Sequence, residues 1–126
     1  MKMIFAVAAG GALGAVGRFL LSSGTGQWLG HGFPFGTLIA NIVGSFLLGI
    51  LLEISAMTWT PSPELRAFLS VGFLGAFTTF STFSLDAVTL WQRGELMTAG
   101  IYVGGSVLIG ISGFLLGVFM VKSVLS

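Results

Sequence analysis

Charge is scarce in this chain of 126 residues, because Lys and Arg total 5, Asp and Glu total 4, and only 7% of the sequence is charged. Soluble domains carry roughly 25% charged residues, so these few cannot provide a solvated surface. The formal net charge of +1 provides no basic patch for nucleic acid. Cysteine is absent, which excludes disulfides and thiolate metal sites.

Hydrophobic residues make up 55% of the sequence, and they gather in four long runs. A helix needs about 20 apolar residues to cross the hydrocarbon of a bilayer. The runs cover residues 3–21, 35–56, 65–91 and 96–121. The first run follows a basic residue and could pass for a signal peptide, but three more runs follow, and cleavage would leave no soluble domain. The sequence therefore predicts an all-α membrane protein, with residues 1–126 as one four-helix transmembrane domain.

Residues typical of turns separate the runs. The first predicted loop contains residues 22–26 and 30–34, the second covers 58–63 with two prolines, and the third is a tight turn at 92–95. Trp28, Trp59 and Trp91 fall at or near the predicted helix ends. This placement is typical of the aromatic belt of a membrane protein.

Glycine is abundant, with 20 residues, and it recurs at a spacing of four that places small residues on one helix face. Small residues allow the close helix packing that association in lipid requires. The predicted stripes are Gly10 with Gly14, Gly36 with Ala40 and Gly44, Gly100 with Gly104, and Gly113 with Gly117.

The positive charges predict a membrane orientation only weakly. Four spans put Lys2, Arg66 and Lys122 on one side and leave Arg18 and Arg93 for the other. Such a small bias allows insertion in both orientations, and two oppositely inserted copies would form an antiparallel dimer. The alternative is that one orientation dominates for other reasons.

The third run contains the most unusual sequence, a dense series of Gly, Ser, Thr and Phe over residues 72–84, with its midpoint near Thr78. Hydroxyl side chains compete for backbone hydrogen bonds, so this run predicts a helix that is broken at the membrane midplane. Open backbone at that depth is tolerated inside protein or against an ion or water. A plain helix–helix interface is the alternative interpretation.

Other candidates lie around this segment. Phe80 and Phe83 are three residues apart, so they share a helix face, and their positive ring edges suit an anion. Asn41 needs a partner in the membrane, either another helix or an anion. Arg18, near the end of the first predicted helix, would extend to the interface or attract anions. Tyr102 and Ser106, four apart, align their hydroxyls.

Taken together, these residues resemble the Fluc family of bacterial fluoride channels, also called CrcB. The resemblance covers essentially the whole chain. It rests on three elements in the expected order, namely Gly17-Arg18, then Gly36-Thr37-Leu38 with Asn41, and then the string from Thr78 to Ser84. It implies a fluoride-selective channel in the bacterial cytoplasmic membrane, with two pores in an antiparallel, dual-topology homodimer.

The resemblance also implies roles for single residues. Fluoride would pass Asn41, Phe80, Phe83, the hydroxyls of Ser81, Thr82, Tyr102 and Ser106, and the vestibule residue Arg18. A structural Na⁺ at the dimer axis would bind the backbone carbonyls of Gly75 and Thr78. Two positions depart from the family pattern: residue 110 is glycine where some relatives have serine, and Asp86 replaces a glutamate.

Fluoride is physically consistent with this composition. A pore must replace tightly held water by many weak donors, and fixed charge would hold the ion too strongly. No Lys or Arg occurs between Arg66 and Arg93. The alternatives are a small multidrug-type transporter, which needs a glutamate in its first helix, and a structural subunit of a membrane complex. An enzyme is not expected, because the spans lack an acid–base or metal constellation.

Overall fold

The computed structural model describes residues 1–30 and 32–126, and within these ranges every regular element is a helix. In chain order the elements are α1 (Lys2–Leu29), α2 (Phe35–Met57), α3 (Pro63–Ala67), the π-helix η1 (Phe68–Leu74), α4 (Gly75–Phe77), α5 (Phe80–Gln92) and α6 (Leu96–Leu125). Four helical stretches in the described residues are long and apolar enough to cross a membrane: Lys2–Leu29, Phe35–Met57, Pro63–Gln92 and Leu96–Leu125. The predicted all-α architecture with four spans is confirmed at this level.

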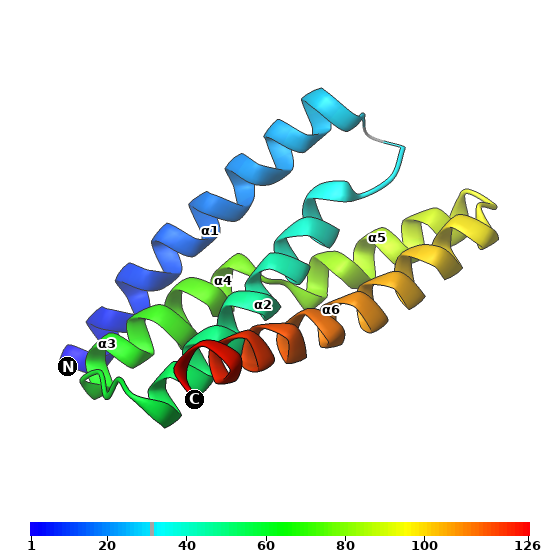
Figure 1. The fold of residues 1–126 in the computed structure, drawn as a ribbon. Coiled ribbons are helices and arrows are strands. Elements are labelled where there is room, and N and C mark those ends of the chain that lie inside the picture. The colour runs from blue at the N-terminus through cyan, green and yellow to red at the C-terminus, as the bar shows by residue number, and fades with distance from the viewer. Residues whose placement is uncertain (31) are drawn as a thin grey trace.

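The elements form two packed pairs that meet along α2 (Figure 1). The helix α2 lies along α6, and α1 lies along η1 and α4. The short helix α3 and both chain termini lie at the same end of the molecule (Figure 1). The helix α5 continues the third span toward the opposite end, where a tight turn joins it to α6.

Glycines form the closest contacts between these helices. A β-carbon on Gly10 or Gly14 would overlap the backbone carbonyl of Phe68 or Phe73 in the third span. A β-carbon on Gly49 would overlap the Phe114 carbonyl, so α2 and α6 touch backbone to backbone. The stripes predicted in the first two spans are confirmed as packing faces, because Gly10, Gly14, Gly36, Ala40 and Gly44 are all buried.

The two glycine pairs predicted in the last span differ from each other. Gly117 fits against the backbone of Phe46 and Ile50, as a packing glycine should. Gly100 and Gly104 meet no atom within 4 Å of an added β-carbon in the described part of the chain. Within the last span, the spacing of four therefore marked a contact face at one of the two pairs.

The first helix is longer than the sequence predicted, because α1 continues to Leu29 through residues that were expected to form a loop. The loop prediction for residues 22–26 is wrong. The Thr25 hydroxyl donates to the carbonyl of Leu21 at 2.9 Å, so it bonds within the helix and does not end it. Ser22 packs against Gly36 of α2. Tertiary packing thus outweighs the low helix propensity of Ser, Thr and Gly.

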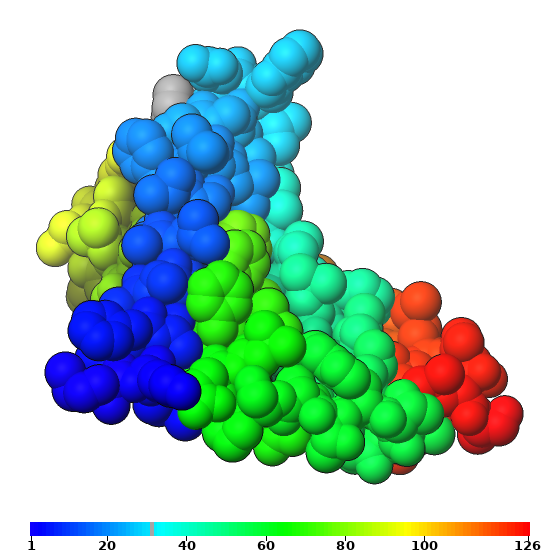
Figure 2. Space-filling model, turned by 90° about the vertical axis from the view of Figure 1, so that its left-hand side faces the viewer, coloured from blue at the N-terminus to red at the C-terminus, as the bar shows by residue number. Residues whose placement is uncertain are grey.

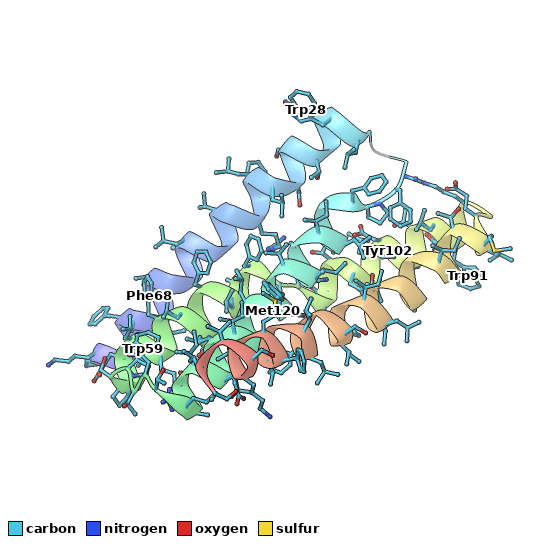
Figure 3. The ribbon with its side chains drawn as sticks, in the orientation of Figure 1. Trp28, Trp59, Phe68, Trp91, Tyr102 and Met120 are labelled. Atoms are coloured by element: carbon cyan, nitrogen blue, oxygen red, sulfur yellow. The ribbon has the colours of Figure 1, made fainter. Side chains whose placement is uncertain are left out.

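The outer surface is apolar. Large hydrophobic side chains on α6 are exposed, including Leu108, Ile111, Leu115 and Phe119. In Figure 2 the outline is concave between the C-terminal end of α1, at the top, and the C-terminal part of α6, at the lower right. Trp28 and Trp91 lie toward one end of the molecule and Trp59 toward the other (Figure 3), which is the placement that the predicted aromatic belt requires. Lipid or protein must cover such a surface in a membrane.

We expect Gly49→Ala to destabilise the protein, whereas Gly100→Ala should not. Both changes raise helix propensity by roughly 0.5–1 kcal/mol, but at Gly49 the new methyl group overlaps the Phe114 carbonyl, and overpacking costs about 1–3 kcal/mol. The measurement is the temperature at which detergent-purified protein loses its size-exclusion peak. Equal melting of the two variants would contradict this account of the α2–α6 interface.

Candidate functional site

The third span contains a short interruption in its helical backbone. The helix α4 ends at Phe77, Thr78 is extended with φ −88° and ψ 158°, and Thr79 is extended with φ −156° and ψ 122°. The helix α5 begins at Phe80. The Thr78 N–H still donates to the Leu74 carbonyl at 3.0 Å, but the i→i−4 pattern stops there, so the backbone groups of Thr79 need other partners.

Asn41 of α2 provides those partners for Thr79. The Thr79 N–H donates to the Asn41 side-chain oxygen at 2.7 Å, and Asn41 Nδ2 donates to the Thr79 carbonyl at 3.2 Å. One side-chain amide thus pairs with both backbone groups of the same residue, as a neighbouring β-strand would. Of the two interpretations of Asn41, the link between helices is present in this chain, and the second Nδ2 hydrogen leaves capacity for a further acceptor.

Arg18 contacts the same segment from α1. Its Nε donates to the carbonyl of Ala76 at 3.2 Å. Because α1 continues to Leu29, Arg18 lies well inside the helix, and its predicted position near the helix end is wrong. The guanidinium is directed at the interruption of the third span, where it satisfies a carbonyl of the last helical turn.

The interruption also releases two carbonyls. In a continuous helix the carbonyls of Gly75 and Thr78 would accept from the N–H groups of Thr79 and Thr82. Those N–H groups donate instead to Asn41 Oδ1 and to Thr79 Oγ1. Gly75 itself is helical, with φ −63° and ψ −39°, so only its carbonyl belongs to the interruption. The extended residues begin at Thr78, near which the sequence predicted the break.

Hydroxyl groups gather where α5 begins. Thr79 is the N-cap of α5, and its Oγ1 accepts from the Thr82 N–H at 3.2 Å. The same Oγ1 lies 3.2 Å from both Ser81 Oγ and Thr82 Oγ1. The predicted residues Ser81 and Thr82 are therefore brought together by a helix cap, beside the Asn41 amide.

A row of aromatic rings begins beside this cluster of hydroxyl groups. The rings of Phe80 and Phe83 lie 5.6 Å apart, and that of Phe83 lies 5.3 Å from Tyr102. Phe33, from the α1–α2 connection, meets Tyr102 edge to face at 5.6 Å. Phe80 is 77% exposed, so its outer side faces away from this chain. Phe33 was missed in the sequence, although a phenylalanine between Gly32 and Pro34 in a predicted loop is a hint that the loop is anchored.

Tyr102 is fully buried, and its hydroxyl donates to Asp86 Oδ2 at 3.1 Å. Figure 3 places Tyr102 on α6. The Oγ of Ser106, one turn further along α6, is shielded from solvent and has no hydrogen-bond partner among the described residues. Tyr102 and Ser106 thus keep the shared face that their spacing predicted, and Asp86 is the unpredicted partner of the tyrosine.

A polar cavity of about 210 Å³ opens beside this pair. Its polar lining comes from three helices and includes Ser22 and Thr25 of α1, Thr37 of α2, and Asp86, Thr89 and Arg93 near or in α5. The cavity therefore links one end of the molecule to the Asp86–Tyr102 pair. Its lining is rich in hydroxyls and contains one charge of each sign.

The arrangement can hold a small ion among many weak donors and released carbonyls. The sequence matches one family over most of the chain. The sequence model of a protein family, described as "CrcB-like protein, Camphor Resistance (CrcB)", matches residues 5–118. The chain belongs to the CrcB family. Within the CrcB family, the chain is similar to proteins named "Fluoride-specific ion channel FluC".

Three CrcB relatives give the extent of the similarity. The one from Rhodospirillum centenum is 50% identical over 123 residues, which is 98% of each chain. The one from Nitrobacter winogradskyi is 48% identical over 119 residues, or 94% of each chain. The one from Rhizobium etli is 43% identical over 127 residues, or 98% of each chain. The resemblance found in the sequence is confirmed, and the CrcB family is not an enzyme family.

We expect Asn41→Ala to destabilise this CrcB protein, because it removes the partners of both Thr79 backbone groups. Leaving such groups unpaired costs about 1–3 kcal/mol. Ser45→Ala, one turn further along α2, is the matched control. Thermal loss of the size-exclusion peak in detergent measures the difference, and equal melting of both variants would show that the Asn41–Thr79 pair contributes nothing.

Proposed function

We propose that this protein is a fluoride-specific ion channel of the bacterial cytoplasmic membrane. The observation that carries the proposal is the similarity over 98% of the chain to relatives bearing that name. The helical architecture agrees, because four of the described helical stretches are able to cross a membrane. The function is conduction of an ion, and no chemical reaction is involved.

The proposed fluoride pathway uses weak donors. Asn41 and the hydroxyls of Ser81 and Thr82 stand together at the start of α5, where they replace part of the water that the anion sheds. The rings of Phe80 and Phe83 follow, with positive edges that attract an anion without a fixed charge. Each donor is weak enough to let the ion leave.

The pathway continues through Tyr102 and Ser106 on α6, with the polar cavity beside Asp86 as an aqueous entrance. Ser106 Oγ is a shielded hydroxyl without a partner in the described chain, which suits a group that bonds a passing ion. Arg18 belongs to the same proposal as the fixed positive charge nearest the interruption, where it attracts anions from the entrance.

A small multidrug-type transporter is not favoured. The family match and the relatives' names point to an ion channel. The charged residues of α1 are Lys2 and Arg18, so this helix lacks the glutamate with which such transporters bind cations.

Purified protein in liposomes should dissipate a fluoride gradient and leave a chloride gradient intact. The expected selectivity over chloride rests on the relatives' name, which specifies fluoride. Ion-selective electrodes follow each anion after the membrane potential is released by a potassium ionophore, with protein-free liposomes as the control. Equal efflux of the two anions would contradict the proposed function.

An antiparallel, dual-topology homodimer is the assembly we propose. It is supported by the weak charge bias, with three cationic residues against two, and by the exposed rings and glycine at the interruption. Phe80 is 77% exposed and Gly75 is exposed as well. A second copy covers them and completes the pore walls.

A C-terminal reporter should therefore be detected on both faces of the membrane, because Lys2, Arg66 and Lys122 bias the orientation only weakly. Adding two lysines after Ser126 should shift the reporter to one face and lower activity, since oppositely oriented partners become rare. A reporter confined to one face in the unmodified protein would rule out the antiparallel assembly.

A structural Na⁺ is proposed at the dimer axis, held by the carbonyls of Gly75 and Thr78 from both copies. The diverted N–H groups of Thr79 and Thr82 support this proposal, because they leave these carbonyls open. Small hard cations prefer oxygen ligands. The sodium would be structural and would not travel with the anion.

Replacing Na⁺ by a large organic cation should weaken dimerisation and fluoride flux together, without changing anion selectivity. Gly75→Leu should do the same, whereas Thr78→Ser should be mild. Within one chain a β-carbon on Gly75 would lie 3.4 Å from the Ser70 carbonyl, so disruption by leucine would come mainly from the partner or the ion. Indifference of the dimer to both changes would contradict the sodium site.

A further inference from the structure

Arg66 is an exposed cation at the end of the molecule where both chain termini lie (Figure 1). Its backbone carbonyl accepts from Ser70 Oγ at 2.6 Å. For its guanidinium, the structure records no hydrogen bond or salt bridge to any of the described residues. Glu64 lies two residues earlier on the same helix α3, and residues at that spacing do not face each other.

Two crevices meet at Arg66. The first has a volume of about 310 Å³ and runs between α2 and the start of the third span, with apolar walls from Leu48, Leu51 and Leu52. The second has a volume of about 390 Å³ and lies on the side of α1, with apolar walls from Met3, Pro63 and Val71. Arg66 and Ser70 line both crevices.

Ser55 also lines the first crevice, but its Oγ is shielded from solvent, so the hydroxyl does not open into the crevice. The polar group that both crevices share at this end is the Arg66 guanidinium. Each crevice thus combines a polar end at Arg66 with an apolar wall.

We propose that Arg66 and its two crevices bind an anionic phospholipid. The phosphate accepts from the Arg66 guanidinium. The two acyl chains follow the leucines of α2 on one side and Met3 and Val71 on the other. Trp59, which marks the membrane interface at this end (Figure 3), puts Arg66 at headgroup level.

Charge selects an anionic lipid over a zwitterionic one. Lys2 and Lys122 lie at the same end as Arg66, against Glu53 and Glu64, so this end has a net positive charge. Basic residues near an anionic lipid surface contribute about 1 kcal/mol each, whereas the headgroup cation of phosphatidylcholine offsets the attraction of its phosphate. A second copy of the chain is the competing occupant of the crevices.

Native mass spectrometry of delipidated protein in detergent tests the proposal with phosphatidylglycerol and phosphatidylcholine. We expect tighter binding of phosphatidylglycerol, and a loss of about five- to tenfold in that affinity for Arg66→Gln, which corresponds to ~1–1.4 kcal/mol. Lys122→Gln is the matched control, because it removes one positive charge at the same end but lines neither crevice. Its effect should stay within about twofold.

Two further measurements, a competition experiment and a salt titration, distinguish lipid binding from binding of phosphate alone. Soluble glycerol phosphate should not displace the lipid, because it lacks the acyl chains. The preference of the unmodified protein for phosphatidylglycerol should fall with added salt, which requires no variant to fold. The proposal would be overturned if Arg66→Gln lost no affinity or if Lys122→Gln lost as much. Displacement of the lipid by glycerol phosphate, or a lipid preference that salt does not change, would also overturn it. So would a dimer that binds no added lipid, because a second copy would then fill the crevices.

Discussion

The pairing of the Asn41 amide with both backbone groups of Thr79 is the constraint on which the rest of the site depends. It holds the third span open in the middle of an otherwise helical protein. Because the Thr79 N–H is taken by Asn41, the Gly75 carbonyl is released, and because Thr79 is extended, its hydroxyl is free to cap α5. The orientation of the cap then directs Ser81, Thr82 and the phenylalanines.

This constraint works only if α2 stays close to the third span, and glycine ensures that closeness. Gly44 lies against the side-chain methyl of Thr78, three residues after Asn41 on α2. Neighbouring positions of one helix therefore hold two consecutive residues of the interruption. From the opposite side, Arg18 of α1 donates to Ala76. The interruption is held between two helices, so its geometry is a property of the packing as much as of its own sequence.

The sequence predicted the spans well, because hydrophobic runs of sufficient length have few alternatives. It also singled out Thr78, where the structure leaves the helix. It did not predict the full length of α1, since Ser22 and Thr25 look like loop residues until their contacts with α2 and with their own helix are known.

Partners distant in the chain were not predictable from spacing either. The bond between Tyr102 and Asp86 and that between Arg18 and Ala76 join different helices. These bonds depend on how each helix is rotated about its axis relative to its neighbours. The periodicity of a single sequence does not determine that rotation.

The polar cavity beside Asp86 has a consequence for the membrane itself. Ser22 and Thr25, which line it, lie four and seven residues beyond Arg18 on α1, or ~6 and ~10 Å along the helix axis. Half the hydrocarbon thickness is about 15 Å. With the interruption at the midplane, as the sequence predicts, this cavity lies at hydrocarbon depth. Water that fills it shortens the insulating layer from that side, so the membrane potential falls over the remaining thickness and its electric field there is steeper than in the surrounding lipid.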